Sequence, residues 1–202
     1  MTGRPRKASD DAILAGAARA ISRVGPSRLT LATIAAETNL SAATLVERFG
    51  SKRDLLLALS QKYSGEPATH FAAARDMHTS PLAAMRAGLH RMAGGFRTPD
   101  EVANFLAFVQ LELTDPDFHR YTRAHANAVV RQVRAQLAAA VDHGELAPGS
   151  PTGLARAVYV TYNGALVSWA ILRTGALGAW LDRELDSLIA PHCVRGNARI
   201  RA

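Results

Sequence analysis

The feature that most constrains this fold is the segment at residues 31–57, which reads LATIAAETNLSAATLVERFGSKRDLLL. Its first eight residues place apolar side chains three and four positions apart, which is the spacing of one helix face. Asn39 then tolerates a left-handed turn, and Ser41 can cap a second short helix. Ser51 and Asp54 form a capping box ahead of a leucine run, so a third helix begins at once. Two short helices joined by a tight turn predict a helix-turn-helix.

Helical periodicity also occupies most of the remaining chain, and the sequence shows neither strand-like alternation nor internal repeats. Further helices are expected at about residues 10–23, 51–64, 81–93, 99–114, 116–143, 151–174 and 178–192. Gly65 and Pro67 interrupt the pattern, so residues 65–80 are expected to form a loop that crosses to a second domain. The predicted fold class is all-α, with a three-helix head in a domain at residues 1–65 and a six-helix body at residues 66–202.

No spacing in the sequence is typical of an enzyme site. The histidines are dispersed, and there is no glycine-rich phosphate loop, no serine nucleophile elbow and no paired-cysteine motif. We therefore expect no catalytic residue, no metal site and no cofactor. Cys193 is the only cysteine, so an internal disulfide is excluded and a reducing compartment is favoured.

A membrane-spanning segment is not expected either. The longest uncharged run, at residues 157–172, is shorter than the about 18 residues that a transmembrane helix needs. The basic N-terminus superficially resembles a signal peptide, but Asp10 and Asp11 intervene, and the apolar residues after them have helical spacing. We expect a mature N-terminus and a cytoplasmic location.

The positive charge is concentrated near the helix-turn-helix. Of the net charge of +7, residues 1–62 carry +5 and residues 63–202 carry +2. This distribution indicates phosphate binding, although a basic solubilising tail would also account for part of it. The N-terminal arm of Arg4, Arg6 and Lys7 can enter the minor groove of A/T-rich DNA, attract DNA only electrostatically, or be plain disorder.

Residues 10–59 resemble the DNA-binding domain of the TetR family of transcriptional regulators. The residues that match the family pattern are Ile13, Ala17, Ala18, Gly25, Thr30, Ile34, Ala35, Leu40, Ser41, Thr44, Leu45, Phe49, Ser51, Lys52, Leu55 and Leu56. Three positions depart from it: Asn39 stands where the family usually has Gly, Val46 where it usually has Tyr, and Arg48 where it often has His. The close resemblance covers about a quarter of the chain.

The resemblance implies a transcriptional regulator, expected to be a repressor, that binds a palindromic double-stranded DNA operator as a homodimer. The residues expected to contact DNA are Arg4, Arg6, Lys7, Arg28, Thr30, Ser41, Ala42, Ala43, Thr44, Val46, Arg48 and Lys52. Because Val46 lacks the tyrosine hydroxyl, one phosphate bond of the family is expected to be missing. Arg48 can replace it, read a guanine, or pair with Glu47 or Asp54 on the surface.

The resemblance also implies a small-molecule effector that changes the separation of the two heads. Candidate lining residues for a mostly apolar effector are Met85, Met92, Phe105, Phe108, Tyr159, Tyr162, Asn163 and Trp169. For any single one of them, the sequence alone favours ordinary core packing or a dimer interface, and the resemblance is what implies that some of them face an effector. The helix at residues 151–174 is apolar almost all round, so we expect it to be buried on more than one side and to dimerise together with the last helix.

Two other functions remain open from the sequence. One is a helical-bundle enzyme or carrier with a vestigial head, which the missing catalytic motifs disfavour. The other is a nucleoid-type protein that coats DNA without sequence preference. A defined palindrome in a footprint favours the regulator, and uniform coverage favours the coating protein.

Overall fold

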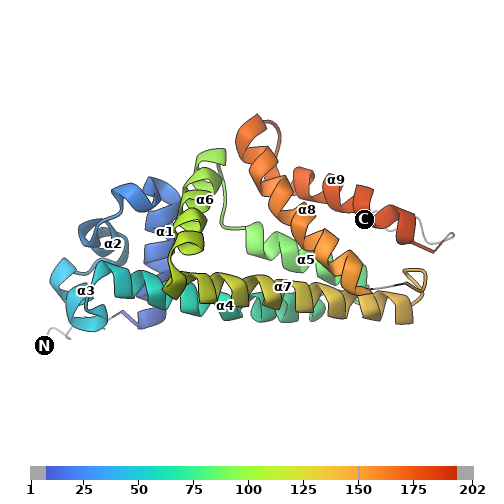
Figure 1. Cartoon of the computed structure of the whole chain (residues 1–202), viewed down its shortest axis with the longest axis horizontal. Coiled ribbons are helices and arrows are strands. Elements are labelled where there is room, and N and C mark those ends of the chain that lie inside the picture. The colour runs from blue at the N-terminus through green and yellow to red at the C-terminus, as the bar shows by residue number, and fades with distance from the viewer. Residues whose placement is uncertain (1–7, 150, 195–202) are drawn as a thin grey trace, which may run out of the picture. The chain divides into compact units, whose positions relative to one another are not determined.

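The computed structural model describes residues 8–149 and 151–194, and this part of the chain contains nine α-helices (Figure 1). In chain order they are α1 (Asp10–Arg28), α2 (Leu31–Thr38), α3 (Ala42–Phe49), α4 (Lys52–Arg75), α5 (Pro81–Ala93), α6 (Pro99–Thr114), α7 (Pro116–Asp142), α8 (Pro151–Leu172) and α9 (Leu177–Ile189). A short 3₁₀ turn, Ala190–His192, follows α9, and Cys193 beyond it forms an isolated antiparallel bridge with Leu146. The predicted all-α fold class is confirmed. Within the described ranges, no helix has the length and apolarity that a membrane crossing requires.

The chain divides into two compact units, and each takes helices from separate stretches of sequence. The first contains residues 1–62 and 100–122, and the second contains residues 63–99 and 123–202. Both α4 and α7 therefore contribute residues to each unit. The boundary expected at residue 65 falls inside α4. α6 belongs to the first unit, where its side chains bond to α1 and α4.

α1 bends where the sequence predicts that it stops. Gly25 has a φ of 73° and a ψ of 163°, a conformation that favours glycine, and the helix then continues to Arg28. Pro26 has no N–H, so it cannot donate to the carbonyl of Ser22, which would be its acceptor in an unbroken helix. The side-chain amide of Asn104 in α6 donates to that carbonyl instead, at 2.8 Å. A residue from another helix thus completes the bend.

The loop predicted at residues 65–80 is wrong, because α4 continues through Pro67 to its end and leaves only residues 76–80 as a connection. Pro67 cannot donate to the carbonyl of Tyr63, four residues earlier. Nδ1 of His125 in α7 lies 2.9 Å from that oxygen, and it must be the donor because a carbonyl only accepts. Burial lowers the pKa of His125, which favours the neutral ring with its proton on Nδ1.

Replacing His125 with phenylalanine should destabilise the protein by about 1–3 kcal/mol, because the Tyr63 carbonyl would lose the hydrogen bond that His125 donates. In a Pro67→Ala background the same replacement should cost much less, since the alanine N–H can bond to Tyr63 within the helix. Denaturant unfolding of the four proteins measures this coupling as a double-mutant cycle. Equal losses in the two backgrounds would mean that His125 acts only through packing.

The second unit has a core built from α5, α8, α9 and the adjoining parts of α4 and α7. Its fully buried side chains include Phe71, Met85, Leu89, Val158 and Leu181. Gly88 allows a close contact between α5 and α4, because a Cβ at this position would lie 2.9 Å from the Phe71 ring. Near the surface, an ion pair of 2.6 Å between Arg86 and Asp186 links α5 to α9.

α8 is buried on one side only, which differs from the expectation for this helix. The side chains that face the core are Ala155, Val158, Tyr162, Ala165, Leu166 and Trp169. On the opposite side, Val160 is 62% exposed, Val167 is 37% exposed and Ile171 is 70% exposed. These three residues are spaced seven and four apart, so they form one apolar stripe along the helix. A single chain leaves that stripe uncovered.

Candidate functional site

The helix-turn-helix forms through local hydrogen bonds that the sequence anticipates. Asn39 adopts the left-handed conformation, with a φ of 53° and a ψ of 40°, and it closes α2. The hydroxyl of Ser41 accepts from the backbone N–H of Thr44 at 3.1 Å and caps α3. Thr30 caps α2 in the same way, by accepting from Thr33 at 3.0 Å. The turn that the family usually makes with glycine is therefore made here by an asparagine.

α1 holds this pair of helices in place through a close contact and a charge cluster. A Cβ at Gly16 would lie 2.3 Å from the Thr38 methyl, so α2 approaches α1 at a distance that only glycine permits. The Glu37 carboxylate forms ion pairs with the guanidinium groups of Arg23, at 2.9 Å, and Arg19, at 3.6 Å. These contacts set the orientation of α2, and with it that of α3.

α3 buries one side and presents the other to solvent. Leu45 is completely buried, whereas Ala43 and Glu47 are exposed and Val46 is 46% exposed. The predicted positions Ala42 and Thr44 are half-buried, and the Thr44 hydroxyl lies 2.9 Å from that of Ser41. The exposed face has small or medium side chains, so another molecule can approach the helix closely.

Arg48 does not have the surface partners expected for it, Glu47 or Asp54. Its half-buried guanidinium donates to the backbone carbonyl of Ala8 and forms an ion pair with Asp10 at the start of α1. Arg48 therefore ties the end of α3 to the start of α1. A guanidinium with a carboxylate partner near the surface can exchange that partner for a phosphate.

The other predicted basic residues have different surroundings. Lys52 begins α4, and its ammonium donates to the carbonyl of Leu29 at 2.7 Å. Arg28 is exposed and donates to the carbonyl of Val24 at 3.0 Å. The residues of the predicted arm, Arg4, Arg6 and Lys7, lie outside the described residues.

Arg53 was not among the residues singled out from the sequence. It follows Lys52, but its side chain pairs with the acids at the start of α7. Its guanidinium bonds to Asp115 and to Asp117, each at 2.8 Å, and lies 5.5 Å from the centre of the Phe118 ring. The hydrogen bond from Arg53 lowers the pKa of Asp115. The two acids on either side of Pro116 are the feature of the sequence from which a cationic partner could have been expected. The contact joins the start of α4 to the connection between α6 and α7.

A buried carboxylate lies further along the same two helices. Glu112 of α6 is 8% exposed, and the hydroxyl of Ser60 in α4 donates to it at 2.5 Å. Burial raises the pKa of Glu112, and the hydrogen bond from Ser60 opposes this rise. Folding therefore favours the protonated form of Glu112 more than it would for an exposed carboxyl group.

Replacing Glu112 with glutamine should raise the melting temperature at neutral pH by about 2–4 °C, the effect of a gain near 1 kcal/mol in a chain of this size. A carboxyl group whose pKa is higher in the folded state binds protons more tightly there. It therefore lowers stability as pH rises from its ordinary value of 4.5 through the folded value. The gain should disappear below about pH 3.5, where the carboxyl group is protonated in the folded state and almost fully protonated in the unfolded state. Thermal unfolding across this range tests it, and a lower melting temperature at neutral pH would contradict it.

The predicted effector residues do not gather in one compact unit. Phe105 and Phe108 belong to the first unit, and the other six belong to the second. Among those six, Met85, Tyr162 and Trp169 are buried. The Trp169 indole donates to the carbonyl of Gly175 at 3.0 Å. Asn163 donates to the carbonyl of Tyr159 at 2.8 Å, and Met92 is half-buried.

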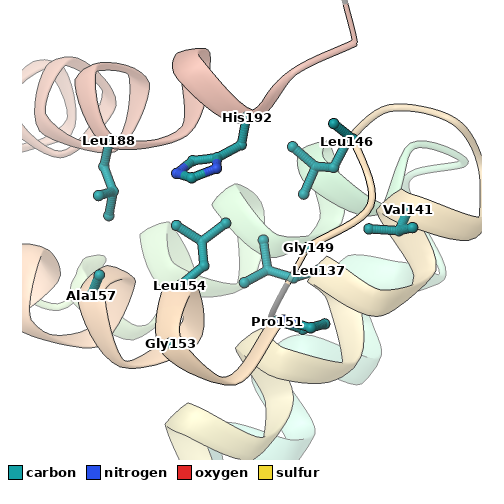
Figure 2. A pocket seen from close by; sticks show the side chains of 11 residues that line it. Leu137, Val141, Leu146, Gly149, Pro151, Gly153, Leu154, Ala157, Leu188 and His192 are labelled. Atoms are coloured by element: carbon teal, nitrogen blue, oxygen red, sulfur yellow. The ribbon is translucent and has the colours of Figure 1, made fainter.

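An apolar cavity lies elsewhere in the second unit, where α7 ends and α8 begins (Figure 2). It has a volume of about 400 Å³ and contains none of the eight predicted residues. Its lining residues are Leu137, Val141, Leu146, Ala147, Gly149, Pro151, Gly153, Leu154, Ala157, Leu188 and His192. In Figure 2 the imidazole of His192 lies beside Leu188 and above Leu154, where it adds a polar group to the lining. No periodic pattern in the sequence marks this cavity, because a loop supplies part of its wall.

Comparison with known proteins gives a match in the helix-turn-helix. Residues 13–59 match the family model described as bacterial regulatory proteins, tetR family. None of the curated proteins matches the sequence.

Solved structures share the fold over almost the whole chain at low sequence identity. A TetR transcription regulator from Haloarcula marismortui has a TM-score of 0.74 and 17% identity, covering 92% of this chain and 98% of that one. A TetR-family regulator from Agrobacterium tumefaciens has a TM-score of 0.71 and 22% identity, covering 92% and 97%. SmeT, the repressor of the Stenotrophomonas maltophilia multidrug efflux pump SmeDEF, has a TM-score of 0.66 and 19% identity, covering 94% and 93%. Residues 13–59 therefore form a helix-turn-helix of the tetR family type, and the chain has the fold of TetR-family regulators.

Proposed function

We propose that this protein is a cytoplasmic repressor that binds a palindromic operator as a homodimer and leaves it when a small, mostly apolar molecule binds. The observation that carries the DNA-binding part is α3, a capped helix with a buried Leu45 and an exposed face of Ala43, Val46 and Glu47. A helix of this kind, supported on its buried side by the preceding helix α2, fits the major groove of DNA.

The exposed face of α3 supports a specific set of contacts. Ala42 and Ala43 are small, so the N-terminus of the helix can approach the base edges closely. Val46 can pack on a thymine methyl, and the Thr44 hydroxyl can bond to a phosphate or a base edge. Glu47 is the acidic residue on this face. Its carboxylate would accept a hydrogen bond from a cytosine amino group, or lie away from the DNA phosphates, which repel it.

Cations beside α3 would bind the phosphates. Lys52 stands at the start of α4, so its ammonium and the free amides of that helix can meet the same phosphate. Arg28 is exposed in the same unit. For Arg48 we propose that a phosphate or a guanine replaces Asp10 as its partner when DNA binds. Arg4, Arg6 and Lys7 would add phosphate or minor-groove contacts.

A homodimer is the state that would cover the stripe on α8. Val160, Val167 and Ile171 form an apolar stripe on the exposed side of α8, and α8 also packs against α9. A two-fold axis places the same stripe of two chains face to face, so one surface covers the other. The two heads of such a dimer would then bind two half-sites.

The effector would release the operator if it binds more tightly to the dimer conformation in which the two heads do not fit the two half-sites. A preference of about 1–3 kcal/mol changes operator affinity roughly 5- to 150-fold. Repression is supported by analogy with SmeT, which is described as the repressor of an efflux pump. The mostly apolar cavity and the buried aromatic residues of the second unit support an apolar effector.

Selection from a pool of random DNA duplexes, followed by a footprint on the selected sequence, tests this function. A regulator should enrich one palindrome and protect two half-sites of it. A nucleoid-type protein should enrich no sequence and protect the duplex uniformly. The absence of any retained duplex at low salt would reject DNA binding altogether.

Effector response can be located with four variants, once a panel of apolar and aromatic compounds has yielded one that releases the operator. Alanine at Phe105, Tyr162 or Trp169 should raise the compound concentration needed for release by at least about tenfold, because large aromatic side chains dominate small-molecule binding. Leu154→Trp fills the cavity of Figure 2 and serves as the comparison. A loss of response in Leu154→Trp alone would assign the effector to that cavity. Unchanged release by all four folded variants would contradict both placements.

A further inference from the structure

A second depression in the second unit differs in chemistry from the apolar cavity. It has a volume of about 490 Å³ and lies between the end of α4, the start of α5 and one face of α7. The α7 residues that line it are Gln132, Ala135, Gln136 and Ala139, which occupy one helix face by their spacing. We call this depression the α4–α5–α7 groove.

The rim of the α4–α5–α7 groove is basic. Arg75, His78 and His143 line it and are exposed, and no acidic residue is among its lining residues. The Arg75 guanidinium is oriented by a hydrogen bond of 3.3 Å to the side-chain oxygen of Gln132. Glu145, a buried acid two residues after His143, does not line the groove. Its carboxylate accepts a hydrogen bond of 3.0 Å from the backbone N–H of Leu82.

The floor of the groove contains a polar group without a partner. Gln136 is only 4% exposed, yet its side-chain amide forms no hydrogen bond with any residue in the described ranges. Both amide atoms retain access to the groove, since neither is among the completely enclosed polar atoms that lack a partner. A primary amide can donate and accept, so it is equipped to bond to a ligand in the groove.

The remaining walls are small and apolar. Pro81 and Ala84 of α5 face the groove from one side, and Ala135 and Ala139 of α7 face it from the other. Small side chains leave room for a compact apolar group between the two helices. Binding sites for small molecules commonly combine such walls with a few converging polar groups.

We infer that the α4–α5–α7 groove binds a small carboxylate that carries a compact apolar group. The carboxylate lies at the rim, where Arg75 can bind both oxygens and the histidines can donate. The apolar group lies on Ala84, Ala135 and Ala139, and the Gln136 amide bonds to the ligand from the floor. This inference does not rest on the proposed function, because binding is measured without DNA.

Nuclear magnetic resonance of the full-length protein, with ¹⁵N in the arginine and glutamine side chains, tests the inference with benzoate as the probe. Benzoate should produce saturable shifts of the Gln136 amide and the Arg75 guanidinium in the millimolar range. Benzyl alcohol has the same ring without the charge, and inorganic phosphate has charge without the ring. Each should bind at least about tenfold more weakly than benzoate.

Matched variants separate this groove from general charge attraction. Arg75→Gln and Gln136→Leu should each weaken benzoate binding at least about tenfold, and Arg75 is exposed, so its replacement should leave the fold intact. Arg131→Gln removes the same charge from an exposed position on α7 outside the groove and should change the affinity by less than about twofold. The inference is overturned if benzoate gives no saturable shift, if phosphate binds as tightly, or if Arg75→Gln binds benzoate like the unaltered protein.

Discussion

Replacing Val160 and Ile171 with glutamate is expected to convert the protein to a monomer and to weaken operator binding at least about 100-fold, because two linked heads bind far more tightly than one. Both residues project from the uncovered side of α8, with exposed fractions of 62% and 70%. In a dimer built on this stripe, each glutamate would be buried against an apolar surface without a partner. In the isolated chain the same side chains face water, so folding should be unaffected.

The expected monomer can be measured by sedimentation velocity at micromolar concentration, with circular dichroism to confirm that the helices remain. Leu113→Glu is the matched control, because Leu113 is an apolar residue of α6 that is 55% exposed. It should leave both the assembly and the operator affinity unchanged. A dimer that survives the double replacement would place the interface on a different surface.

Replacing Ala43 with aspartate is expected to lower operator affinity at least about 100-fold. The exposed methyl of Ala43 lies in the first turn of α3, where the helix would approach the groove. An aspartate there brings a negative charge close to the phosphates in both half-sites, and like charges in contact cost several kcal/mol. Ala103→Asp makes the same change at an exposed position of α6 in the same unit and should bind the operator normally.

The two cations beside α3 can be distinguished in the same binding assay. Lys52→Ala should weaken all DNA sequences alike and lower the salt dependence by about one ion per half-site. Arg48→Ala should either do the same or cost about 1–3 kcal/mol at a single base pair. Both residues also bond within the protein, to Leu29 and Asp10, so melting temperatures must accompany the affinities. Wild-type affinity and salt dependence in Ala43→Asp, Lys52→Ala and Arg48→Ala would refute the assigned DNA face.

The sequence by itself determined the helix-turn-helix and most of the helix ends. Ser9, Ser41, Ser51 and Ser80 each accept a hydrogen bond from the backbone N–H three residues later, as capping signals predict. The left-handed turn at Asn39 also follows from its own side chain and backbone. These features depend on residues that are only a few positions apart, so the local sequence is sufficient to specify them.

The two prolines within helices show where that reasoning fails. The sequence marks Pro26 and Pro67 as breaks, because each removes a hydrogen bond to the carbonyl four residues earlier. Asn104 supplies the donor for the first carbonyl and His125 supplies it for the second. Each donor comes from another helix, so no local pattern could reveal it.

Side-chain partners and cavities were likewise decided by the tertiary structure. Arg48 pairs with Asp10, and Arg53 pairs with Asp115 and Asp117, over separations of 38 to 64 residues. The buried Trp169 was a reasonable pocket residue by its type, but the described cavities lie where other residues, several of them from loops, leave space. Periodicity identifies which face of a helix is apolar. Which helix packs on that face, and where the packing leaves a void or an unpaired amide, is determined only when distant segments meet.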